Sequence, residues 1–66
     1  MKIEEAIRYF ERELEKVEEA EATEAATAEP DEDLLHAWSY EREATDMALT
    51  ALRVIRARLV CLGIDV

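Results

Sequence analysis

The sequence predicts an all-α protein, an antiparallel two-helix hairpin that assembles into a dimeric or larger helical bundle. Of its 66 residues, 50% are hydrophobic and 38% are charged, with one Gly and one Pro. This is the composition of long helices rather than of strands and turns. Apolar residues recur at helical spacing in two long segments, and Pro30 separates them. We therefore expect a single helical-hairpin domain over residues 1–66.

The first helix is expected to span residues 2–28, approximately. Large apolar side chains recur there at spacings of 4, 3, 4 and 3, which places them on one helical stripe. The stripe consists of Ile3, Ile7, Phe10, Leu14 and Val17. Beyond Val17 the same stripe continues with Glu21 and then with alanines. Because the residue before a proline is disfavoured in helical geometry, Glu29 is expected to begin a turn of about 29–31.

The second helix is expected over residues of about 31–62, with Gly63 as its stop and a tail over 63–66. Asp31, Glu32 and Asp33 suit the positive end of its dipole. Its expected apolar face is broad and consists of Ala37, Tyr40, Ala44, Met47, Ala48, Ala51, Leu52, Ile55, Leu59 and Leu62, widened by Leu49, Val54 and Val60. One partner helix is too narrow to cover such a face.

If the chain turns near Pro30, Leu14 lies opposite Met47 and Phe10 opposite Ala51, and everything after about Leu59 overhangs the first helix. A chain this short also has little core of its own. Both observations predict a homo-oligomer, a dimer or higher. The predicted self-association residues are Trp38, Met47, Leu52, Ile55, Leu59, Val60, Leu62 and Ile64.

Few residues are candidates for chemistry. Asp33 and His36 have the carboxylate-x-x-His spacing of di-iron bundles, although a surface histidine with a local partner fits as well. Glu21 and Glu41 fall at the same level of the hairpin, where they face each other, solvent or an arginine. Cys61, flanked by apolar residues, is expected to be a small buried hydrophobe. No catalytic residue, metal ligand set or cofactor is predicted.

Of the four aromatic residues, Phe10 and Tyr40 are expected to pack in the core. Trp38, which points to another side of the helix, is a candidate interface anchor. The charged N-terminal segment does not have the form of a signal peptide, and no apolar run approaches the length of a membrane span. We therefore expect a cytoplasmic protein, with no membrane as its partner.

Charge is distributed unevenly along the chain. The formal net charge of −9 disfavours direct binding of nucleic acid or anionic membranes and favours a basic protein as partner. Residues 18–33 contain eight acids and no base, whereas residues 47–64 contain three arginines and no acid. The predicted partner-binding acidic surface consists of Glu18, Glu19, Glu21, Glu24, Glu29, Asp31, Glu32 and Asp33. Three roles fit these acids: they imitate nucleic acid, they face the basic end of a second copy, or they face only water.

Two segments, "MKIEEAIRYFERELE" and "YEREATDMALTALR", resemble the two helices of many short helical-hairpin proteins encoded by bacteriophages and prophages. The insert "AEATEAATAEPDED" and the tail "VCLGIDV" depart from that pattern. Most such proteins have no known activity and no functional residues to carry over. The resemblance implies an accessory protein that acts by binding, and small acidic phage proteins include inhibitors of host defence such as anti-CRISPR proteins.

The predicted function is therefore that of a small, acidic, non-catalytic protein-interaction module. In its specific form it is a phage-encoded inhibitor of a host defence or nucleic-acid-binding protein in the host cytoplasm. One alternative is a purely structural self-association module, and another is a metal-binding bundle built from carboxylates and histidine.

Overall fold

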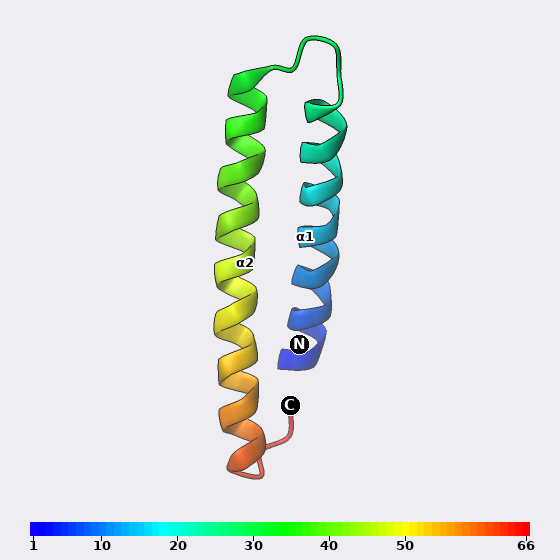
Figure 1. The fold of residues 1–66 in the computed structure, drawn as a ribbon. Coiled ribbons are helices and arrows are strands. Elements are labelled where there is room, and N and C mark those ends of the chain that lie inside the picture. The colour runs from blue at the N-terminus through cyan, green and yellow to red at the C-terminus, as the bar shows by residue number, and fades with distance from the viewer.

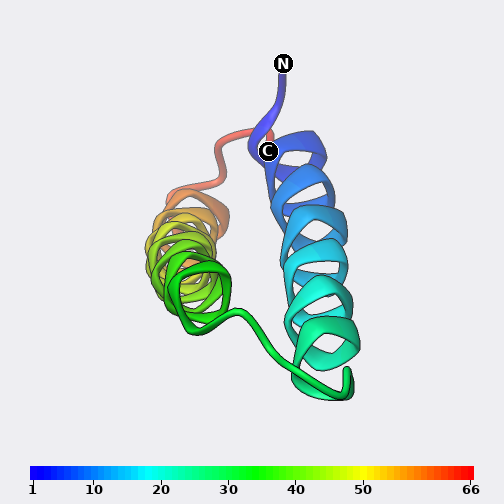
Figure 2. The same cartoon turned by 90° about the horizontal axis from the view of Figure 1, so that it is seen from above.

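A computed structural model describes residues 1–66 and contains two helices, α1 (Ile3–Ala25) and α2 (Glu32–Cys61). The helices lie side by side and antiparallel, joined by one loop, with both chain termini at the other end (Figures 1 and 2). The molecule is a rod of 52 × 15 × 14 Å. The predicted all-α hairpin is thus confirmed.

The apolar stripe of α1 faces α2 as predicted. Ile7 and Val17 are buried, at 2% and 5% exposure, and Ile3, Phe10 and Leu14 are half-buried beside them. The spacing of these residues in the sequence thus correctly predicts which side of α1 packs against α2.

The face that α2 turns towards α1 agrees with the predicted one at Leu49, Leu52 and Leu59 but differs elsewhere. Apart from Ser39 and Ala48, the buried and half-buried positions recur at spacings of 3 and 4 along the helix. They form an inner series that consists of Leu35, Trp38, Arg42, Thr45, Leu49, Leu52, Arg56 and Leu59. Tyr40 and Met47, which the sequence places in the core, are each 73% exposed. The predicted contact between Leu14 and Met47 is therefore wrong, and Leu49 at 1% exposure is the central core residue of α2.

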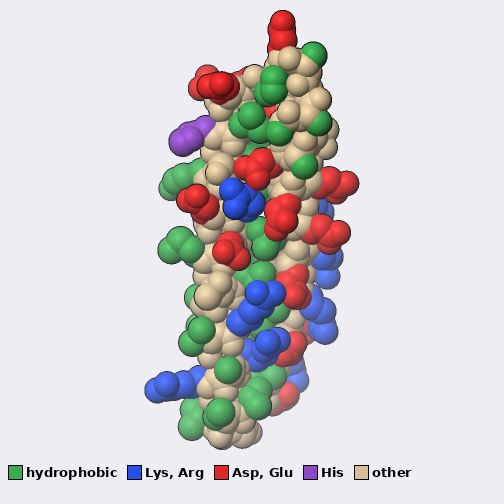
Figure 3. All heavy atoms as spheres, in the orientation of Figure 1, with side chains coloured by type: hydrophobic (Ala, Val, Ile, Leu, Met, Phe, Trp, Pro, Cys, Tyr) green, Lys and Arg blue, Asp and Glu red, His purple; other side chains and the backbone are tan.

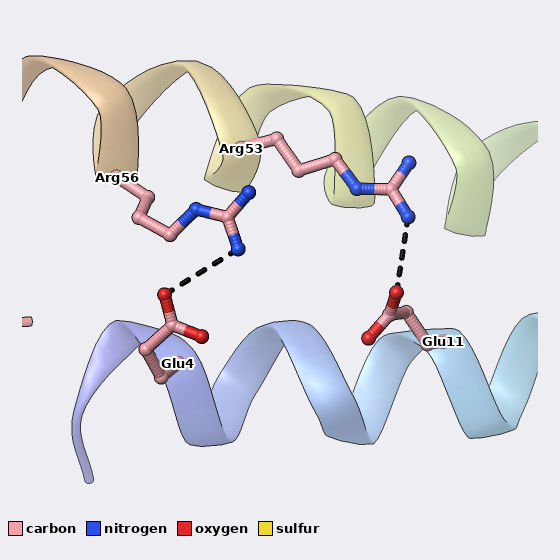
Figure 4. Close-up of polar contacts among 4 residues, drawn as sticks. All are labelled: Glu4, Glu11, Arg53 and Arg56. Atoms are coloured by element: carbon pink, nitrogen blue, oxygen red, sulfur yellow. Dashed lines mark hydrogen bonds and ion pairs between the residues drawn. The ribbon is translucent and has the colours of Figure 1, made fainter.

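Ion pairs between the helices explain how the inner series of α2 can include two arginines. The Arg42 Nε atom lies 3.0 Å from Glu21 Oε1, and the Arg56 Nη1 atom lies 3.4 Å from Glu4 Oε1. Figure 4 shows the second of these beside the Arg53–Glu11 pair at 3.2 Å. Each arginine of the inner series therefore meets a glutamate of α1.

Helix α1 ends at Ala25, before the predicted boundary near residue 28. The Thr27 N–H and hydroxyl both donate to the Glu24 carbonyl oxygen, at 3.1 and 2.8 Å, and so occupy the acceptor that a further helical turn would use. No basic residue lies in the last turn to offset the helix dipole. The turn consequently spans 26–31 rather than 29–31.

The start of α2 follows the predicted helix-start chemistry. Asp31 is the N-cap, and its Oδ1 atom accepts hydrogen bonds from the Asp33 and Leu34 N–H groups at 3.0 and 3.2 Å. Glu32 and Asp33 lie in the first turn, at the positive end of the dipole.

Gly63 stops α2 as expected, with a φ of 73° that favours glycine. The Gly63 N–H donates to Val60 and the Ile64 N–H to Leu59, at 3.0 and 2.9 Å, which is the Schellman pattern. The last turns of α2 extend past the start of α1, as the expected overhang requires (Figure 1), but the residues after Gly63 do not continue outward. They fold back, so that the Val66 carbonyl oxygen accepts from the Glu4 N–H at 3.0 Å (Figure 2).

Candidate interaction surface

The loop end of the hairpin carries eight carboxylates, which we call the acidic tip. They are Glu18, Glu19, Glu21, Glu24, Glu29, Asp31, Glu32 and Asp33. In Figure 3 acidic side chains spread over this end, whereas most Lys and Arg lie in the half nearer the termini. The hairpin thus gathers acids from the end of α1, the loop and the start of α2 on one end of the molecule.

Three carboxylates of the acidic tip have partners within the chain. Glu21 pairs with Arg42 across the helices, and Asp31 caps α2. The Glu24 Oε1 atom accepts from the Asp31 N–H at 2.8 Å and thereby closes the loop. These residues shape the tip, so substitution of any of them changes the fold as well as the charge.

The other five carboxylates, which we call the free acids, are exposed and form no ion pair. They are Glu18, Glu19, Glu29, Glu32 and Asp33. Glu18 and Glu19 are adjacent in α1, and the last turn of that helix contains no base that could offset their charges. A basic ligand would therefore reduce the electrostatic repulsion among the free acids, which form no ion pair within the chain.

An open groove of about 1000 Å³ runs between the helices at the acidic tip. Carboxylates from both helices border it, among them Glu18 of α1 and Glu32 and Asp46 of α2. Apolar lining comes from Leu14, Ala22, Ala25 and Leu35. The groove is thus an acidic depression with an apolar part, suited to a basic segment that also offers apolar surface.

The groove contains few cations of its own. Arg42 is engaged by Glu21 and also donates from Nη2 to the Ser39 hydroxyl at 3.3 Å. His36 lines the groove and is exposed. Of the three possibilities for Glu21, pairing with an arginine is the one found, and the arginine is Arg42. Glu41 is exposed and forms no ion pair.

The carboxylate-x-x-His motif of Asp33 and His36 gains no further ligands from the fold. No group of three or more His, Cys, Asp or Glu side chains is placed to hold one metal ion. Cys61 is exposed, so the expectation that it is a buried hydrophobe is wrong. It lies in the last turn of α2, on a side that α1 does not cover.

The predicted self-association residues divide into two groups. Trp38, Leu52 and Leu59 are half-buried in the inner series towards α1. Met47, Ile55, Val60, Leu62 and Ile64 are exposed, at 73%, 45%, 58%, 68% and 50%. Tyr40, predicted to lie in the core, and Val54, predicted to widen the apolar face, are 73% and 64% exposed on the outer side of α2.

Neither helix is long and apolar enough to cross a membrane. Comparison of the chain with models of known protein families, with curated proteins and with solved structures gives no match. Its function must therefore be argued from the surface of the hairpin.

Proposed function

We propose that this protein is a small, non-catalytic interaction module that binds a basic protein at its acidic tip. The observation that carries the proposal is the groove between the helices, which acids from both helices border and whose one arginine is engaged by Glu21. The free acids have no partner in the chain, so a basic segment can neutralise them without breaking an internal contact.

The kind of basic protein follows from the density of charge. One strand of B-DNA carries a phosphate about every 3.4 Å. A helix with a carboxylate every two or three residues approaches that density, at about 3 to 4.5 Å per charge. Residues 18–24 contain four glutamates. We infer that the partner is a nucleic-acid-binding protein, which places a basic segment of its nucleic-acid-binding surface in the groove at the acidic tip.

The resemblance to short phage and prophage hairpins suggests the biological role in which this binding would be used. A protein that covers the nucleic-acid-binding surface of a host protein acts as an inhibitor, and the host factor is of the defence or nucleic-acid-binding class. In this form the protein works in the cytoplasm of the host cell.

The test is retention of proteins from a bacterial lysate on the immobilised chain. We expect a basic nucleic-acid-binding protein to be retained at low salt and released by high salt or by competing duplex DNA. A tip variant with Glu18, Glu19, Glu29 and Glu32 changed to Gln should lose it. Glu21, Glu24 and Asp31 are left intact because they hold the tip together.

A matched control separates the acidic tip from net charge. Changing Glu5, Glu13, Glu15 and Glu43 to Gln also removes four charges and leaves a net charge of −5 instead of −9. This shaft variant should retain the partner as the wild type does. Equal loss in both variants would show that only total charge matters and would refute a site at the tip.

A second candidate function is structural self-association, which the exposed apolar side chains of α2 favour. Only three residues of the hairpin are fully buried, while ten large hydrophobic residues are exposed. A two-helix chain with so small a core gains stability by covering such residues in a second copy. Sedimentation that finds a stable monomer at micromolar concentration would exclude this function.

A further inference from the structure

Helix α2 has a second heptad-spaced series of residues on the side that faces away from α1. Residues 37, 40, 44, 47, 51, 54, 58 and 61 recur at spacings of 3 and 4, each two positions after a member of the inner series. Two residues along an α-helix correspond to a rotation of about 200°, so this outer series lies opposite the inner one. All its members are exposed. Figure 3 shows hydrophobic side chains projecting from that edge of α2.

The outer series alternates small and large side chains. Ala37, Ala44 and Ala51 occupy one heptad position. Tyr40, Met47 and Val54 occupy the other, with exposures of 73%, 73% and 64%. Arg58 and Cys61 continue the series into the last turns of α2. Apolar residues repeated every 3.5 positions are what a helix presents to a coiled-coil partner.

We propose that a second copy of this chain packs antiparallel on this outer series, with the two α2 helices crossing at the level of Leu49. The proposal rests on the self-association proposed above and adds the interface, its direction and its register. Each subunit would then use the inner series of α2 for its own α1 and the outer series for its mate.

Side-chain size selects the antiparallel direction. With the crossing point at Leu49, Met47 lies opposite Ala51 of the partner subunit, and Val54 opposite Ala44 of the partner subunit. Large residues thus meet alanines along the seam, which lets the helices approach closely. A parallel pair would instead set alanine against alanine and Tyr40 against its own copy, leaving gaps between large residues.

Charge selects the same direction and register. Arg58 is the one charged residue of the outer series, and this pairing sets it opposite Tyr40 of the partner subunit, next to Glu41 of the partner subunit. Glu41 forms no ion pair within its own chain, nor does Arg58. The arginine would gain both an aromatic face and a carboxylate. Parallel pairing would place the two arginines against each other.

The length of the seam is adequate for a stable contact. From Ala37 to Cys61 the outer series extends about 36 Å along the helix axis. This register overlaps the whole series in both subunits, whereas a shift of one heptad leaves one end of it unpaired.

Cysteine cross-linking tests direction and register together. In a Cys61→Ser background, Ala44→Cys chains are mixed with Val54→Cys chains that carry a mass tag, and the mixture is mildly oxidised. The two positions face each other across the proposed interface, so we expect a mixed disulfide dimer. Neither variant alone should cross-link, because its two copies of the cysteine lie about 15 Å apart along the axis, too far for a disulfide.

Each other outcome overturns a defined part of the proposal. Cross-linking of each variant with itself would show a parallel pair. Absence of any cross-link, while sedimentation finds the wild type dimeric, would place the interface elsewhere. A wild type that sediments as a monomer would refute self-association itself. The natural Cys61 gives an internal check, since its two copies lie about 36 Å apart and should not form a disulfide.

A substitution in the seam gives an independent measurement. Met47→Asp puts a charge at the centre of the interface and should raise the dissociation constant of the dimer by at least about tenfold. Tyr9→Asp makes a comparable change at an exposed aromatic residue of α1 and should leave the constant unchanged. An equal effect of the two variants would contradict the assignment of the interface to α2.

Discussion

Two arginines lie on the side of α2 that packs on α1. Arg42 and Arg56 occupy the inner series, where apolar residues would be expected, and each is met by a glutamate of α1. Both pairs are only partly buried, so their charges keep much of their hydration. Their main effect is to let the apolar residues between them, above all Leu49, enter the core.

Removal of Glu21 tests this role at the residue scale. Glu21→Ala leaves Arg42 half-buried without its carboxylate and should lower the free energy of unfolding by about 0.5 to 1 kcal/mol, measured by urea denaturation. Combining it with Arg42→Leu should recover the loss, because leucine extends the apolar seam. Glu19→Ala, at a free acid, should change stability by less than about 0.5 kcal/mol. Equal losses for Glu19 and Glu21 would contradict the pairing.

The two helices are terminated by different devices. Thr27 closes α1 by occupying the Glu24 carbonyl oxygen, and Glu24 in turn accepts from Asp31 to hold the loop. Gly63 closes α2 in a Schellman motif and redirects the chain towards the start of α1. The Val66 carbonyl oxygen then meets an N–H of the first turn of α1 that has no partner within its own helix.

Substitution of Gly63 tests the second device at the element scale. No atom lies within 4 Å of the place that a Cβ would occupy, so the cost of Gly63→Ala is that of the backbone conformation, about 1 kcal/mol. Gly63→Asn should cost less, since asparagine tolerates a positive φ. Hydrogen exchange of the Glu4 amide should accelerate in the alanine variant. An unchanged rate would show that the fold-back of the tail does not depend on Gly63.

The whole molecule is a thin rod with excess negative charge. The net charge of −9 is spread over a structure 52 Å long, with its densest part at the acidic tip. The rod has one face packed within the chain and a second apolar face on α2. A molecule with this distribution is held together by a small core against its own repulsion.

Salt should therefore stabilise the protein. Raising the ionic strength from about 0.02 to about 0.5 M screens repulsion among the acids, and we expect the thermal midpoint to rise by about 5 °C. The tip variant, which lacks four free acids, should start from a higher midpoint at low salt and respond less. The cross-helix ion pairs weaken in salt as well, but exposed pairs contribute little. A midpoint that falls with salt would show that these pairs dominate.

Sequence patterns correctly predict the helical class, the hairpin turn near Pro30, the inward face of α1, the start of α2 at its acidic N-cap and the stop at Gly63. These depend on local periodicity and on backbone chemistry, which act over a few residues. The acidic tip could also be predicted, since its residues are close in the sequence. Which of its carboxylates lack a partner could not be predicted, because Glu21, Glu24 and Asp31 find their partners only in the folded chain.

Which of the two apolar stripes of α2 faces α1 depends on contacts between the two helices. The outer series is the more uniformly apolar, so a hydrophobic pattern favours it for the core. The inner series nevertheless contains the larger apolar side chains, four leucines and Trp38, and Glu4 and Glu21 of α1 stand opposite its arginines. These ion pairs join residues 21 to 52 positions apart, so the periodicity of either helix does not reveal them. Of the face that the sequence predicts for the core, Leu49, Leu52 and Leu59 are buried or half-buried, whereas Tyr40, Met47 and Val54 are exposed.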